Sequence, residues 1–157
     1  MDNYLEILQE SLVKKREILD CILEISQKQI ALLEGPDMTL EKYDQYVDRK
    51  SECIERLQNL DEGFEILYEK ISEALSQNRE RYADQIHILQ GLIREVTERS
   101  VSIQAMEARN KKQVEEYFRK ERKLIQSARI SSKAAMDYYE NVNRLKYVEA
   151  QFLDKKK

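Results

Sequence analysis

The chain has 157 residues, enough for one domain and too few for two full cores. Charged residues make up 36% of it and hydrophobic residues 41%. Three glycines and one proline argue against an all-β fold, which needs a turn every ~8–12 residues, and against glycine-rich phosphate loops. No apolar run approaches the roughly 18 residues of a membrane span, and the acidic, amphipathic start does not resemble a signal peptide. We therefore expect a cytoplasmic protein.

Charge is uneven along the chain. Residues 1–78 contain 18 acidic and 9 basic side chains, a net charge of −9. Residues 79–157 contain 12 acidic and 18 basic side chains, a net charge of +6. Halves of opposite charge suit an antiparallel, self-complementary arrangement. Solvent-exposed helix faces whose charges differ by evolutionary drift, without a structural role, would give the same pattern.

The first predicted helix covers about residues 3–34. Lys15 interrupts its apolar stripe, and we expect the lysine stem to lie along the seam with the ammonium group in water. Gly35 and Pro36 end this helix, and a second one begins at Asp37 or Thr39, both good N-caps. The apolar stripe has the three- and four-residue spacing of one helix face: Leu5, Leu8, Leu12, Leu19, Ile22, Ile25, Ile30 and Leu33.

The second predicted helix covers about residues 39–76. Its apolar repeat runs to Leu57, with Lys50 at one seam position, and then shifts by one residue to Leu60. The polar residues 76–78 predict a turn, although a continuous rod through Leu75 and Tyr82 is an alternative. Before and after the one-residue shift the stripe consists of Leu40, Tyr43, Val47, Ile54, Leu57, Leu60, Phe64, Leu67, Ile71, Ala74 and Leu75.

A hairpin at this turn places Gly63 and Gly91 at the same level. Facing glycines would let the two helices approach closely. The other interpretation is that each is tolerated separately, at about 1 kcal/mol in a helix interior.

The third predicted helix covers about residues 79–113 and continues onward. From Val114 its repeat becomes strictly heptad, with Ser, Ala and Glu at several positions that usually hold Leu. The fold class is therefore all-α: residues 1–113 form three long antiparallel helices in an elongated bundle or coiled coil. Residues 114–157 form a C-terminal extension that is helical or partly disordered.

Hairpin geometry places the start of the second helix level with about Glu115. Beyond that level neither earlier helix can cover the third one, so its apolar residues mark a partner surface, a self-association surface or a segment that folds back. Aromatic side chains are frequent anchors at interfaces. The candidate partner-binding residues are Val114, Tyr117, Phe118, Leu124, Ile125, Tyr138, Tyr139, Val142, Leu145 and Phe152.

Chemistry-bearing residues are scarce. The single histidine, His87, has no acidic or cysteine cluster beside it, so we expect neither a catalytic base nor a metal site, and no cofactor. Cys21 and Cys53 fall at matching levels of the first hairpin, as a pair able to cross-link or as two small residues beside the seam. The basic run from Arg109 to Lys123 is interleaved with glutamates, which favours a solvated face or an acidic partner over nucleic acid.

Four stretches resemble the FlgN-type flagellar export chaperones. They are residues 103–112 (IQAMEARNKK), 114–118 (VEEYF), 151–157 (QFLDKKK) and 30–35 (IALLEG). The resemblance is one of pattern over the whole chain.

This resemblance implies a cytoplasmic, all-helical chaperone without catalysis, small-molecule substrate or cofactor. It would hold the terminal helical region of a hook-associated protein and escort it to the type III export gate. Its C-terminal part would carry the contacts, with Tyr117, Tyr138 or Tyr139 as the aromatic residue at the gate. The alternative is a structural coiled-coil scaffold or homo-oligomer, such as a homodimer.

Overall fold

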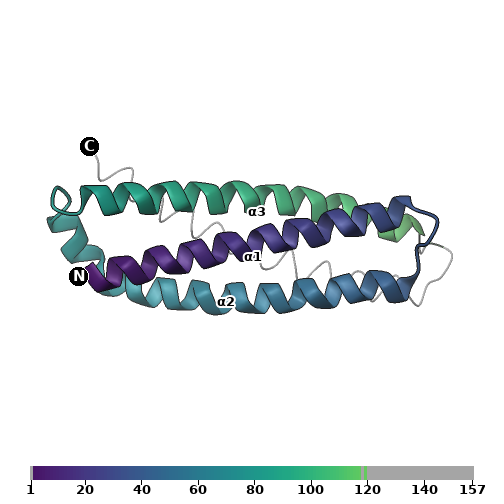
Figure 1. Cartoon of the computed structure of the whole chain (residues 1–157), viewed down its shortest axis with the longest axis horizontal. Coiled ribbons are helices and arrows are strands. Elements are labelled where there is room, and N and C mark those ends of the chain that lie inside the picture. Colours follow the sequence, from purple (N-terminus) through teal and green to yellow (C-terminus); the bar gives the residue numbers. More distant parts are fainter. Residues whose placement is uncertain (1, 118, 120–157) are drawn as a thin grey trace.

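The computed structural model describes residues 2–117 and 119. It contains three helices, α1 (Asp2–Glu34), α2 (Leu40–Gln77) and α3 (Ala83–Tyr117), joined by two short connections. Figure 1 shows them side by side along nearly their whole length, with α2 antiparallel to both α1 and α3. The predicted all-α bundle of three long helices is confirmed for these residues.

The first connection follows the local chemistry of its residues. The Gly35 amide donates a hydrogen bond to the Leu32 carbonyl (3.2 Å) where α1 ends. Thr39 is the N-cap of α2, and its hydroxyl oxygen accepts a hydrogen bond from the Lys42 amide (3.2 Å). This bond satisfies one of the amide groups that a helix start leaves without a partner.

The second connection confirms the predicted turn, and the continuous-rod alternative is wrong. Asn78 caps the C-terminus of α2, and α3 begins at Ala83, four residues after the predicted start near Arg79. The Asn78 amide donates to the Leu75 carbonyl (3.2 Å), and its side-chain nitrogen donates to the Ala74 carbonyl (2.8 Å). A polar residue that binds carbonyls at the end of α2 thus replaces the glycine that more often ends a helix.

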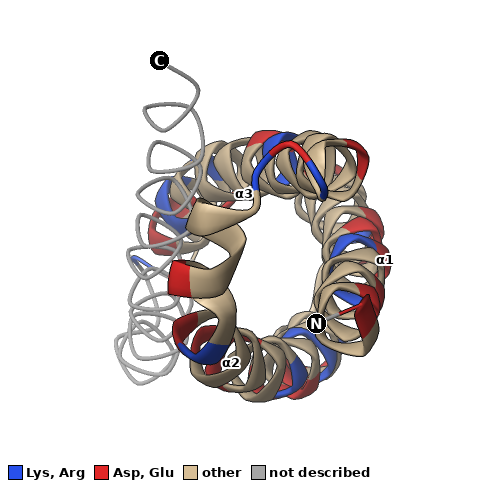
Figure 2. Ribbon diagram, turned by 90° about the vertical axis from the view of Figure 1, so that its left-hand side faces the viewer, with Lys and Arg blue, Asp and Glu red and all other residues tan. Residues whose placement is uncertain are grey.

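The three helices do not pack equally. α1 packs against both α2 and α3, whereas no Cα atom of α2 lies within 8 Å of a Cα atom of α3. Seen along the bundle in Figure 2, α2 and α3 lie on different sides of α1. Of the two interpretations of Gly63 and Gly91, the close approach is therefore wrong: a Cβ atom added at either glycine would meet nothing within 4 Å.

Most of the apolar core forms one long cluster, which ends near Ile25, Ile54 and Ile103. A smaller cluster around Met38, Tyr43 and Val114 lies at the end of the bundle where α1 and α2 connect. The predicted stripe shift in α2 does not occur. Leu57, Phe64 and Ile71 are buried at intervals of seven residues, whereas Leu60 is only half-buried.

Candidate partner-binding site

Only two of the ten candidate partner-binding residues lie in the described part of the chain. Val114 is 1% exposed and packs with Met38 and Tyr43, so its side chain belongs to the core of the bundle. Tyr117 is 48% exposed, and its hydroxyl donates a hydrogen bond to the Met38 carbonyl (3.1 Å). The other eight lie outside the described residues: Phe118, Leu124, Ile125, Tyr138, Tyr139, Val142, Leu145 and Phe152.

These two residues fix where α3 ends relative to the other helices. Val114 and Tyr117 contact Met38 and Tyr43, which flank the start of α2. The last turn of α3 is therefore level with the connection between α1 and α2, as hairpin geometry predicts. The sequence after Tyr117 starts from this end of the bundle.

A layer of polar side chains separates the two apolar clusters just inside this end. The ammonium group of Lys50 in α2 binds the carboxylate of Glu107 in α3, and both side chains are less than 10% exposed. Ser26, Gln29 and Asn110 are also fully buried, and their side-chain polar atoms have no hydrogen-bond partner in the described structure. Sequence reasoning noticed Lys50 as an irregular seam position and missed the rest of this layer.

Electrostatics follow from this burial. Desolvation lowers the pKa of Lys50, and Glu107 opposes that change. Desolvation also raises the pKa of Tyr43 well above its ordinary value, and the Glu107 carboxylate raises it further. The layer thus joins α2 to α3 through side chains at a level where their backbones stay apart.

A second, partly buried ion pair links α1 to α2. Lys15 is 2% exposed and binds Asp61, so the prediction that its ammonium group lies in water is wrong. Burial lowers the pKa of Lys15, and Asp61 opposes that effect. The outer edge between α1 and α3 has exposed or half-exposed ion pairs, Arg99 with Asp20 (2.6 Å) and Arg16 with Glu95.

Cys21 and Cys53 lie together beside a cleft of about 560 Å³ between α1 and α2, and both are free thiols. Burial raises the pKa of the Cys53 thiol, and the neighbouring Cys21 raises it further. A raised pKa keeps a thiol protonated and less reactive. The predicted matching level is confirmed. Arg56, which lines the same cleft, acts to lower the Cys53 pKa but does not outweigh the effect of burial.

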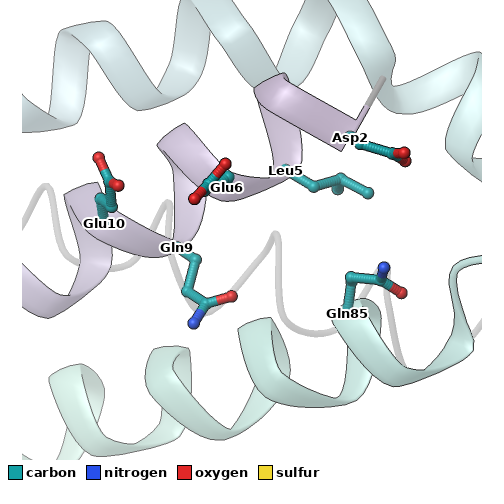
Figure 3. A pocket seen from close by; sticks show the side chains of 6 residues that line it. All are labelled: Asp2, Leu5, Glu6, Gln9, Glu10 and Gln85. Atoms are coloured by element: carbon teal, nitrogen blue, oxygen red, sulfur yellow. The ribbon is translucent and has the colours of Figure 1, made fainter.

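A smaller cleft of about 370 Å³ lies between the beginnings of α1 and α3. Figure 3 shows Gln9 and Gln85 extending into the space between the two helices, whereas the carboxylates of Glu6 and Glu10 point away from α3. These carboxylates therefore do not converge on one point. Among the described residues, no group of three or more His, Cys, Asp and Glu side chains is arranged to hold a metal ion.

The remaining sequence candidates are surface residues. His87 is exposed on α3. Arg109, in the basic run, binds Glu34 of α1 (2.5 Å), and Lys111 and Lys112 are exposed. Figure 2 shows blue and red residues interspersed along the described helices. None of these helices has both the length and the apolar character needed to cross a bilayer.

No known protein family matches the chain, and no curated protein or solved structure does. The fold defines the class of protein: an elongated bundle of long helices with one buried and one partly buried ion pair among the described residues.

Proposed function

We propose that this chain is a protein-binding chaperone of the flagellar export type. Its client is the terminal helical region of a hook-associated protein, which it escorts in the cytoplasm to the type III export gate. Residues 117–153 supply the client-binding surface, with Tyr117, Leu124 and Tyr138 among its anchors. Val114 is left out of this surface because its side chain is buried in the bundle. The resemblance of the sequence to FlgN-type chaperones supports the choice of client.

The observation that carries this proposal is the level at which α3 ends. The three described helices already form a core, and Tyr117 lies level with the connection between α1 and α2. The sequence beyond it continues with a seven-residue repeat, which has apolar residues at Leu124, Tyr138 and Leu145 and a serine at position 131. Such a stripe is suited to an amphipathic helix of a partner, which is recognised through anchors at helical spacing.

Calorimetric titration of the full chain with the terminal helical fragment of a hook-associated protein tests this proposal. Asp at both Leu124 and Tyr138 should weaken binding at least tenfold, because interface anchors often contribute about 2 kcal/mol or more each. The matched control adds two negative charges off the stripe, at Gln126→Asp and Gln151→Asp, and should bind as the unchanged chain does.

Circular dichroism of each variant reports whether the bundle is retained. Unchanged binding by the Leu124→Asp, Tyr138→Asp variant would contradict the proposal and move the site to the described bundle. A chain that binds no client, and that light scattering shows to be a stable dimer or larger assembly, would support the scaffold alternative.

A further inference from the structure

Of the three pairs of helices in the bundle, α2 and α3 are the pair whose backbones do not approach each other. α1 packs closely against both α2 and α3, but no Cα atom of α2 lies within 8 Å of a Cα atom of α3. Paired helices usually lie 8–10 Å apart between axes. No described helix packs between α2 and α3 on the side away from α1, which we call the α2/α3 face.

Two residues show that this face belongs to the core. Gln90 lies nine residues before Arg99, which binds Asp20 of α1, and so points about half a turn away from α1. Gln90 is nevertheless 0% exposed. Tyr68 lies nine residues after Asn59, which lines the α1–α2 cleft, and it is half-buried against the core. Burial raises the pKa of the Tyr68 hydroxyl.

The buried residues form layers seven residues apart. The Lys50–Glu107 and Lys15–Asp61 pairs fix the register of the three helices. Moving by heptads along the antiparallel helices then defines five layers. From the α1–α2 connection to the α2–α3 connection they are Leu33–Tyr43–Val114, Ser26–Lys50–Glu107, Leu19–Leu57–Ser100, Leu12–Phe64–Ile93 and Leu5–Ile71–Ile86.

We propose that residues 120–153 dock on the α2/α3 face as a fourth, antiparallel helix that completes these five layers. Helix–helix connections in bundles commonly have 2–8 residues. If the chain turns back within about four residues of Tyr117, one residue of the heptad stripe that begins at Leu124 falls level with each layer. In the same order as the layers these residues are Leu124, Ser131, Tyr138, Leu145 and Phe152.

The chemistry of each level matches this assignment. Ser131, the polar member of the stripe, falls at the Ser26–Lys50–Glu107 layer, where the Ser26 hydroxyl has no hydrogen-bond partner in the described structure. Tyr138, a large residue, falls at the layer where α3 contributes the small Ser100. Leu124, Leu145 and Phe152 fall at apolar layers. A shift of one residue would remove this match.

The length and net charge of residues 120–153 also suit docking on the α2/α3 face. At 1.5 Å per residue, a helix over residues 120–153 spans about 50 Å, as long as α3. α2 has ten acidic and five basic residues, a net charge of −5. Residues 120–153 have seven basic and four acidic residues, a net charge of +3. Net charges of opposite sign favour this segment beside α2.

Docking itself does not depend on the proposed function, since it concerns the free protein. One consequence does rest on that function: the stripe that would hold a client is covered in the free protein, so a client must displace it.

A distance measurement tests the docking. Spin labels are attached at Glu80→Cys and Gln151→Cys in the full chain, with Cys21→Ser and Cys53→Ala removing the native thiols. Docking places the labels about 20 Å apart, whereas α3 continuing outward would place them about 100 Å apart. A dominant distance near 20 Å that persists after dilution with unlabelled protein supports docking. A short distance that disappears on dilution assigns the face to a second copy and overturns it, as does the absence of any distance below about 60 Å.

Hydrogen exchange tests the register. Leu145→Asp should increase amide exchange at least tenfold around Phe64 and Ile93, the residues of its layer. Gln151→Asp adds the same charge off the stripe and should leave that exchange unchanged. Equal exchange in the two variants would overturn the assigned register. If the label distance were short but the client did not bind in the titration, the chaperone function would be refuted and the docking would still stand.

Discussion

At the scale of single residues, the Lys50–Glu107 pair is the most consequential feature of the bundle. Two charges are desolvated near one end of the core, and each is compensated by the other. Replacing a buried ion pair by apolar residues is often neutral or stabilising, whereas removing one partner leaves an uncompensated charge. We infer that the pair sets the register of α2 against α3, because apolar residues at these two positions could also pack with the helices shifted along each other.

Lys50→Met should lower the free energy of unfolding by about 3–5 kcal/mol, because it leaves the Glu107 carboxylate buried without its counter-charge. The double variant Lys50→Met, Glu107→Leu should recover most of that loss. Urea denaturation followed by circular dichroism measures both. Lys28→Met, which removes an exposed pair with Glu24 on α1, is the control and should change stability by less than about 0.5 kcal/mol. Equal effects of Lys28→Met and Lys50→Met would contradict the buried-pair interpretation.

Tyr43 gives a pH dependence of known sign. Its pKa is raised in the folded chain, so the native state keeps a proton that the unfolded state loses above about pH 10. This contribution to stability is complete below pH 10 and decreases as the pH rises toward the folded pKa.

Between pH 10 and 11.5 the unchanged chain should therefore lose up to about 1.4 kcal/mol per pH unit more than Tyr43→Phe does. Denaturant titrations at fixed pH values measure the difference, and the lysines contribute equally to both proteins. Parallel pH profiles of the two proteins would show that Tyr43 is accessible to water in the native state.

At the scale of helices, the sequence predicted the two connections and the apolar faces because local chemistry determines them. Gly35, Pro36 and Thr39 specify the first connection whatever the tertiary context. The stripe shift in α2 was wrong because Asp61 takes a seam position that an apolar residue usually holds, and its partner Lys15 lies 46 residues earlier. A pairing between distant residues leaves no periodic signal in either helix.

The glycines test the corrected helix packing. An added Cβ atom at Gly63 meets nothing, and this glycine is exposed within α2. Gly63→Ala should therefore raise the free energy of unfolding by about 0.5–1 kcal/mol through helix propensity alone. Thermal and urea denaturation measure the change. A loss of stability would mean that another helix backbone approaches α2 at Gly63, as facing glycines would require.

At the scale of the whole molecule, the level of each helix followed from the sequence, whereas the spacing between α2 and α3 did not. Turn positions fix which residues share a level, and Val114 beside Tyr43 confirms that reasoning. Two helices that both pack on α1 are not thereby packed on each other. The buried polar layer was missed for a different reason: polar side chains such as Ser26, Gln29 and Asn110 usually lie on the surface of a helical bundle.

A docked segment that also binds a client makes a further prediction about affinity. Glu62 and Glu69 are exposed on α2, about half a turn around the helix from Cys53 and the α1–α2 cleft. They therefore lie toward the α2/α3 face, where the basic segment 120–153 is proposed to dock. Changing both to Lys should weaken docking and leave the client-binding stripe untouched.

The client should then bind more tightly to the Glu62→Lys, Glu69→Lys variant than to the unchanged chain. Apparent affinity is reduced by the fraction of molecules whose binding surface is accessible, so each kcal/mol lost from docking raises it about fivefold. The control reverses two exposed glutamates seven residues apart on α1, Glu10→Lys and Glu17→Lys, and has the same net charge. Calorimetric titrations compare the three proteins. Equal strengthening in both variants would reflect net charge alone, and weaker binding only in the α2 variant would make the α2/α3 face part of the client site.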